Sequence, residues 1–295
     1  KEYSAKAGKE IANKINAVMP QNPLLLLMFP DSYTVNINDF FRGIKNTLVK
    51  PLLFCGGLSA HNFPFLTQTH QYHNDQVLTD AAPCILISGK VKIEIGVNHG
   101  CMPIGIEKTI TKAKGNTVYK IDDKSAWAFF KQYLGEEVKD ISIELRAFIS
   151  LGEKLPDEIS KEYDNFIIRS PYSLNPDESI NFASELPEGA KVQLVRRDED
   201  KIFKGTKYMA ERIKLKLKGK KPIAVLHFDC AGRGKKFFGD KVKEKGIDVI
   251  QDVLGKDIPW LGVYCFGEIA PINKMNYFHN QTVVLCVIYS DIQDR

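Results

Sequence analysis

Short apolar runs bounded by turn residues constrain the fold of this chain more than any other feature. One such run is residues 24–29, and further runs occupy 223–228, 261–266 and 282–288. A membrane-spanning helix needs about 20 apolar residues, so none of these runs can cross a bilayer. Runs of this length between turn residues are typical of buried β-strands. We therefore expect a strand-rich core and no membrane span.

Helical faces alternate with strands at the start of the chain. Ile11, Ile15 and Val18 repeat at helical spacing, and Phe40 and Ile44 begin a second apolar face before the strand at 52–55. This strand–helix–strand order is typical of an α/β fold.

Residues 66–120 change to short strands. We expect one hairpin from residues 84–88 and 91–97 around Gly89 and Lys90, and a second from 104–110 and 117–121. The sequence therefore predicts mainly antiparallel pairing in this region.

A helix carrying Trp127 follows, with Asp122 or Asp123 as its expected N-cap and Gly135 at its end. The stretch after it is charged and polar, so we place a domain boundary there, giving domains 1–150 and 151–295.

The second half alternates strands and helices. Helices are expected at 202–217 and 242–254, and strands at 166–168, 179–182, 191–195, 223–228, 261–266 and 282–288, the last two buried. Residues 213–218 also alternate like a strand, which competes with the first helix. The expected fold class is mixed α/β (α+β), with two domains of largely antiparallel sheets flanked by helices.

Charge and cysteines narrow the function classes. The net charge is +5, and its one basic concentration, residues 201–221, lacks an aromatic stacking pattern or a nucleic-acid motif. A solvated helix face therefore explains it better than nucleic-acid binding. The six cysteines form no CxxC pair, which favours reduced core thiols and a cytoplasmic location.

Four clusters of chemically active residues stand at strand ends. They are Gly96 to Gly105 with His99, His227 to Gly234 with Arg233, Gly262 to Ile269 with Glu268, and Phe278 to Thr282 with His279.

Enzyme motifs are missing from these clusters. The Arg233 turn lacks the Gly-Lys-Ser/Thr of a phosphate loop, and no Ser or Cys lies in a nucleophile elbow. His227 and Cys230 are three apart, so strand alternation sends them to opposite faces. Catalysis is therefore the less favoured interpretation.

Taken in order, the clusters resemble the FIST family. The N-terminal part is similar through Gly56-Gly57, His99-Gly100 and Lys114-Gly115-Asn116. The C-terminal part is similar through Cys230-Ala231-Gly232-Arg233-Gly234, Gly267-Glu268-Ile269 and Phe278-His279-Asn280. On this resemblance, domain 1–150 is FIST N-terminal-like with a truncated start, and domain 151–295 is FIST C-terminal-like.

The resemblance implies an intracellular sensory input domain in signal transduction, not an enzyme. It implies a small ligand such as an amino acid, and an output partner such as a kinase (as in two-component signalling), a chemoreceptor or a cyclic-dinucleotide enzyme. Some relatives sense nitric oxide through haem, and relatives fused to an F-box recruit proteins. A haem sensor and a protein-recruitment module are therefore the alternatives.

We expect the ligand pocket at the junction of the two domains, because pockets favour such junctions. His99, also the candidate metal ligand, would come from the first domain, and Arg233, Glu268 and His279 from the second, with Gly234 and Gly267 beside them. Each residue has a structural alternative: a hydrogen bond at a turn for His99 and His279, and a salt bridge for Arg233 and Glu268.

Overall fold

The computed structural model describes residues 3–61, 68–160 and 163–290 of the chain. These residues form two compact units, each assembled from separate segments. Unit 1 comprises residues 1–98, 206–278 and 282–295, and unit 2 comprises residues 99–205 and 279–281. The division at residue 150 that the sequence suggests remains a prediction.

Unit 1 is built on two main sheets, ordered β18-β17-β2-β1-β5 and β16-β15-β19-β6, and the hairpin β3-β4. Its strands are β1 (Pro23–Met28), β2 (Leu53–Gly57), β3 (Gln71–His73), β4 (Gln76–Leu78), β5 (Cys84–Ser88), β6 (Lys92–Asn98), β15 (Pro222–Cys230), β16 (Trp260–Cys265), β17 (Glu268–Ile272), β18 (Met275–His279) and β19 (Val283–Tyr289). Its helices are α1 (Ser4–Val18), α2 (Ile37–Lys45), α7 (Lys235–Phe238), α8 (Val249–Leu254) and most of α6 (Glu199–Leu217).

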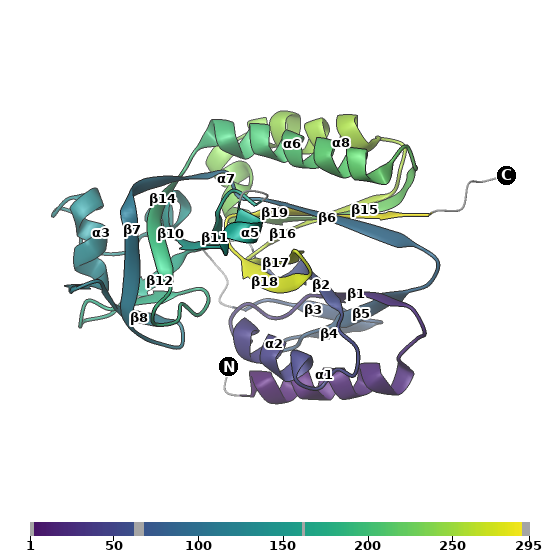
Figure 1. The fold of residues 1–295 in the computed structure, drawn as a ribbon, viewed down its shortest axis with the longest axis horizontal. Helices are drawn as coiled ribbons and strands as arrows, with labels where there is room; N and C mark the ends of the chain where they lie inside the picture. Colours follow the sequence, from purple (N-terminus) through teal and green to yellow (C-terminus); the bar gives the residue numbers. More distant parts are fainter. Residues whose placement is uncertain (1–2, 62–67, 161–162, 291–295) are drawn as a thin grey trace. The chain divides into compact units, whose positions relative to one another are not determined.

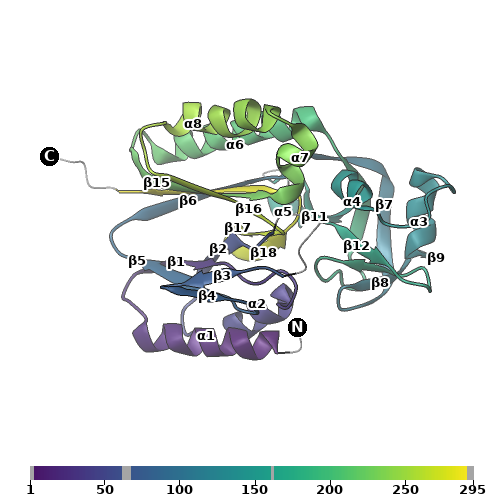
Figure 2. The ribbon, with the colours of Figure 1, turned by 180° about the vertical axis from the view of Figure 1, so that it is seen from behind.

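Unit 1 has four layers, with two sheets face to face between two helical layers (Figure 1, Figure 2). α1 and α2 cover the β1 sheet, while α6 and α8 cover the β15 sheet. Leu25, Leu27, Phe228 and Val284 belong to the core that fills the space between the sheets. Because both faces of each sheet are covered, the central strands are continuous apolar runs.

Glycine allows α1 and α2 to cross closely. A Cβ placed on Gly8 would lie 2.3 Å from the Phe40 carbonyl oxygen, and one on Gly43 would lie 2.0 Å from the Ala5 carbonyl oxygen. Both positions therefore require a residue without a side chain.

Unit 2 is a single sheet with order β11-β10-β14-β7-β8-β13-β12, and β9 pairs with β8. Its elements are β7 (Cys101–Lys114), β8 (Thr117–Ile121), β9 (Lys124–Ser125), α3 (Ala126–Leu134), α4 (Ile143–Phe148), β10 (Ile149–Lys154), α5 (Asp157–Ser160), β11 (Phe166–Arg169), β12 (Pro171–Leu174), β13 (Ile180–Phe182) and β14 (Lys191–Arg197). Trp127 and Phe130 of α3 pack with Leu151 and Leu194 in its core.

The mixed α/β class with largely antiparallel sheets is confirmed. The hairpin at Lys114 to Asn116 forms between β7 and β8. Residues 213–217, whose pattern fits either a strand or a helix, are helical, because α6 continues to Leu217. All six cysteines have free thiols; four are buried, and Cys84 and Cys230 are half-buried.

The prediction of a hairpin around Gly89 is wrong. β5 and β6 are strands as predicted, but β5 pairs with β1 and β6 pairs with β19, in different sheets. The Gly89 turn therefore carries the chain from one sheet of unit 1 to the other.

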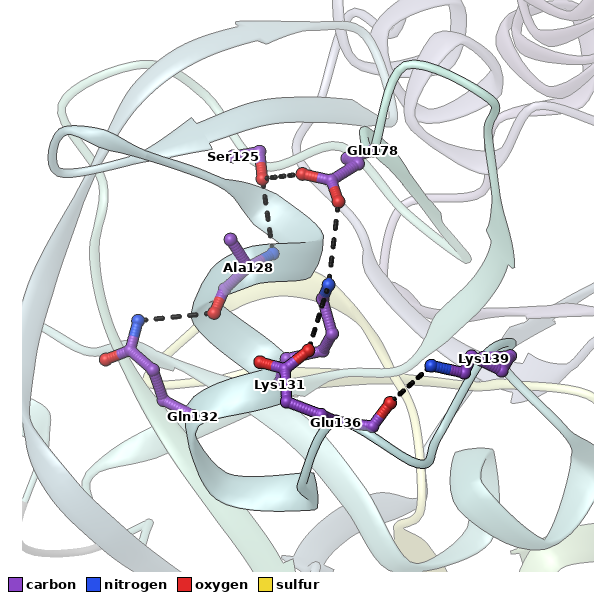
Figure 3. A network of polar contacts seen from close by, with 7 residues as sticks. All are labelled: Ser125, Ala128, Lys131, Gln132, Glu136, Lys139 and Glu178. Atoms are coloured by element: carbon purple, nitrogen blue, oxygen red, sulfur yellow. Dashed lines mark hydrogen bonds and ion pairs between the residues drawn. The ribbon is translucent and has the colours of Figure 1, made fainter.

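The N-cap expected for the helix at Trp127 is also wrong. Ser125 caps α3, since its Oγ accepts the Ala128 amide at 3.2 Å and also donates to Glu178 (Figure 3). Asp122 instead accepts the Thr109 amide and pairs with Lys108.

Two elements of the second half differ from the prediction. β16 forms but is not buried, because it is an edge strand with Leu261 61% and Val263 40% exposed. The helix expected at 242–254 begins as a π-helical turn, Val242–Asp248, before α8.

Within the described ranges, no helix is both long and apolar enough to cross a bilayer. In the same ranges, no three His, Cys, Asp or Glu side chains are grouped as a metal ion would require.

Candidate functional site

The candidate site lies at the carboxyl ends of the parallel strands of unit 1. β1 runs parallel to β2, and β15 runs parallel to β16. A cavity of about 720 Å³ is lined by Phe29 directly after β1, by residues 57–60 at the end of β2 and by residues 263–265 at the end of β16. Ligands of α/β proteins bind in the crevice outside the carboxyl ends of such strands.

The cavity has apolar walls and a polar rim. Phe29, Leu58, Leu86 and Val263 supply apolar surface. The rim includes the β3 segment, whose lining residues are His70, Gln71, Tyr72, His73 and Asn74. The Gln71 amide is already used, because it donates to Asp31 and Thr69 and accepts from Ala81. The rim is therefore fixed to the body of unit 1 through Gln71.

A buried ion pair stands at the end of β15. Arg233 Nε donates to Asp229 Oδ1 at 2.7 Å, and Arg233 Nη2 donates to Thr206 Oγ1 of α6 at 3.0 Å. His227 Nε2 lies 3.6 Å from Asp229 Oδ2. Burial acts to raise the pKa of Asp229, but the Arg233 charge and the His227 contact outweigh it, so the net pKa is lowered. Asp229 is therefore a carboxylate at neutral pH.

Glu268 is the second acid of this cluster and is 0% exposed. Its Oε2 accepts the Thr282 amide at 3.2 Å. Burial raises the pKa of Glu268 well above its usual value, and the Asp229 charge adds to the rise, while the Thr282 amide and Arg233 offset part of it. The cluster thus contains one ionised acid and one acid that favours its neutral form.

Two motif glycines join the cavity wall to this cluster. A Cβ on Gly57 would lie 2.1 Å from Cys265 Sγ, and a Cβ on Gly234 would lie 3.3 Å from the Tyr264 ring. Cys265 and Tyr264 both line the cavity. Tyr264 therefore joins the cavity lining to the turn that carries Arg233, with its ring beside Gly234.

His99 belongs to unit 2 and is buried. Its Nδ1 accepts the Cys101 amide at 2.9 Å, so the imidazole holds the turn into β7. A Cβ on Gly100 would lie 2.5 Å from Ile202 Cα, so close packing against α6 requires this glycine.

The segment 279–281 also belongs to unit 2 and is held by side-chain hydrogen bonds. Gln281 Nε2 donates to the Arg146 carbonyl at 2.7 Å and to Ser150 Oγ at 2.8 Å, while Asn280 Oδ1 accepts the Ser170 amide at 3.1 Å. His279, which the sequence singled out, is buried beside them in the chain.

The structure brings some of the sequence-predicted residues together. Arg233 and Glu268 lie in unit 1, close enough for the Arg233 charge to act on the Glu268 carboxyl. Gly234 and Gly267 flank them, and Gly267 accepts the Leu58 amide at 2.9 Å. His99 and His279 lie in unit 2, so their place in a shared pocket remains a prediction.

Sequence reasoning missed Asp229, Thr206 and Tyr264. Asp229 had a usable signal, because it stands four residues before Arg233 at a strand end. Thr206 had none, since it lies in a distant helix.

A haem at His99 would need an apolar slot beside the imidazole. The space next to Gly100 is filled by Ile202, and Nδ1 is engaged by Cys101. This environment fits a packed turn better than a haem pocket. Titration of the protein with haemin tests the point: a saturable Soret shift at one equivalent, lost in His99→Ala, would restore the haem alternative.

Comparisons with known families match almost the whole chain. The FIST N domain matches residues 1–124, and the FIST C domain matches residues 126–271. The chain belongs to the FIST family. FIST domains are signal-transduction sensory domains, so this FIST chain is a sensory module.

Proteins similar to this FIST chain occur in bacteria and archaea. The uncharacterized protein Mb0898c of Mycobacterium bovis is 27% identical over 91% of this chain and 68% of its own length. The uncharacterized protein MT0656 of Mycobacterium tuberculosis is 26% identical over 89% of this chain and 67% of its own length. The uncharacterized protein MJ1623 of Methanocaldococcus jannaschii is 26% identical, but over only 45% of this chain and 27% of its own length.

Proposed function

We propose that this FIST chain is a non-catalytic input module that binds a small metabolite in the cavity of unit 1. The observation that carries the proposal is the position of the cavity at the carboxyl ends of two pairs of parallel strands. Its volume of about 720 Å³ suits a small molecule, since ligand cavities span roughly 300–1,000 Å³.

A route from the cavity to α6 supports a sensory role. Tyr264 lines the cavity and packs on Gly234, and the neighbouring Arg233 donates to Thr206 of α6. A ligand that contacts Tyr264 more favourably in one state of this turn shifts the population toward that state. An output partner such as a kinase, a chemoreceptor or a cyclic-dinucleotide enzyme would respond to this shift in the population of the two states.

The chemistry of the cluster bears on whether the ligand is an amino acid. In that hypothesis Arg233 binds the carboxylate and Glu268 binds the ammonium group. Arg233 already pairs with Asp229, and Glu268 favours its neutral form. These contacts favour another small metabolite, because an amino acid would have to displace Asp229 from Arg233, and because burial opposes a charge on Glu268.

Calorimetry on a panel of amino acids and apolar metabolites tests the proposal. Ile85 lines the cavity, and Ile106 is a strand isoleucine of unit 2, so Ile85→Trp narrows the cavity while Ile106→Trp is the matched control. We expect one saturable site that Ile85→Trp weakens about tenfold or more, which is 1.4 kcal/mol or more, and that Ile106→Trp leaves unchanged.

The ligand should be recovered chemically unchanged after prolonged incubation. Consumption of the ligand would replace the sensory proposal with an enzymatic one. Binding that is insensitive to Ile85→Trp would show that the ligand binds outside this cavity.

A further inference from the structure

Among the residues that the structure describes, 17 line the cavity, and none of them is Asp, Glu, Lys or Arg. Burial raises the pKa of the Cys84 thiol to about 12 and that of the Cys265 thiol well above its usual value. Burial and the Asp229 carboxylate also raise the pKa of Tyr264. These three side chains therefore remain neutral donors at neutral pH.

Arg233, the buried cation at the end of β15, is engaged by its own partners. Arg233 directs Nε to Asp229 and Nη2 to Thr206, and its side chain is 3% exposed. A charged group that enters the cavity would lose part of its water without gaining an opposite charge from these lining residues. Desolvation of a charge is unfavourable unless a partner compensates for it.

The wall offers aromatic surface in place of charge. Phe29 directly follows β1, and Tyr72 comes from β3 with the His70 and His73 imidazoles beside it in the chain. Flat rings gain from contact with aromatic faces beyond the area they bury. The polar groups of the lining, including Ser59 and Asn74, are uncharged donors and acceptors.

We propose that the cavity takes an uncharged, largely apolar ring compound, with its polar substituent toward His70 and His73. This inference rests on the proposed function and narrows the ligand to a chemical class. It excludes zwitterions and anions of similar size as the preferred occupant.

Two fluorescent probes with the same ring system test the inference. N-phenyl-1-naphthylamine is uncharged, and 8-anilinonaphthalene-1-sulfonate adds one sulfonate to it. We expect saturable binding of the neutral probe at one equivalent, about tenfold or more tighter than the sulfonate, because a tenfold ratio needs only 1.4 kcal/mol of desolvation.

A matched pair of variants locates the binding. Ile85 lines the cavity and is 55% exposed, and Ile106 is 67% exposed in unit 2, so both tolerate arginine without loss of core packing. Ile85→Arg should weaken the neutral probe and strengthen the sulfonate, whereas Ile106→Arg should change neither. Val263→Arg repeats the test from β16 if Ile85→Arg lowers the melting temperature.

The possible outcomes distinguish a failure of this inference from a failure of the proposed function. Equal affinity for the two probes at an Ile85-sensitive site would overturn the uncharged class and leave ligand binding intact. Tighter binding of the sulfonate to the parent protein would do the same. Absence of saturable binding by the neutral probe would also overturn the inference, and the metabolite panel would then decide the proposed function alone.

Discussion

Removing the guanidinium of Arg233 should destabilise unit 1 strongly. The Arg233 side chain is 3% exposed and its partner Asp229 is 13% exposed. Arg233→Met keeps much of the apolar stem but leaves the Asp229 carboxylate buried without its main counter-charge. Loss of one partner from a buried pair costs roughly 3–5 kcal/mol, and we expect the lower value of about 3 because Asp229 retains some solvent contact.

The expected shift in melting temperature follows from chain length. At about 2.1 cal/mol/K per residue, unfolding the whole chain carries an entropy of about 0.6 kcal/mol/K, so about 3 kcal/mol corresponds to about 5 °C. Differential scanning calorimetry measures this shift. Lys235→Met is the matched control, because Lys235 begins α7 two residues after Arg233, its pair with Asp240 is solvent-exposed, and such pairs contribute little.

The loss should depend on pH. Since the pKa of Asp229 is lowered in the folded chain, its stabilisation is present above the unfolded pKa and is lost as pH falls through the folded value. In Arg233→Met the lowering by the guanidinium is removed, so the gap between variant and parent should shrink toward acid pH. A melting temperature within 1–2 °C (about 1 kcal/mol) of the parent at pH 7, or a gap independent of pH, would refute the reasoning.

Three further predictions concern Glu268, Gly57 and Gln281. Because the pKa of Glu268 is raised on folding, stability should fall as pH rises above its unfolded value, and Glu268→Gln should flatten this fall in urea unfolding between pH 5 and pH 8; parallel profiles would contradict the assigned shift. Gly57→Ala should destabilise the chain, since its Cβ would lie 2.1 Å from Cys265 Sγ, and adding Cys265→Ala should recover part of the loss; without recovery the clash is not the cause. Gln281→Ala should cost about 1–3 kcal/mol in chemical denaturation by leaving buried acceptors unpaired, whereas the exposed Gln132→Ala should cost little; equal losses would show that the buried bonds do not matter.

The sequence predicted those elements whose signals are local. The helical face of Ile11 and Ile15 produced α1, and the Lys114 to Asn116 turn produced the β7–β8 hairpin, because periodicity and turn chemistry act within a few residues. The Gly89 turn was interpreted in the same way and gave a wrong pairing. There the pairing is decided by β1 and β19, which lie far from the turn in the sequence.

The site shows the same limit. Arg233 and Glu268 stood out as polar residues at glycine-flanked strand ends, and in the structure the Arg233 charge acts on the Glu268 carboxyl. The apolar run of β16 indicated burial, but its place at a sheet edge leaves Val263 exposed. Strand order depends on contacts between distant segments, so neither the edge nor the cavity beside it could be predicted from local pattern.

The interleaved units have a consequence for synthesis on the ribosome. β19 is a central strand that pairs with β15 and β6, yet residues 99–282, which include all of unit 2, are made between β6 and β19. At roughly 5–20 residues per second, β6 therefore waits on the order of ten seconds or more for its partner. During that interval the backbone edge of β6 is open to chaperones. The nascent chain therefore passes through a stage in which unit 2 can fold before the β15 sheet of unit 1 is complete.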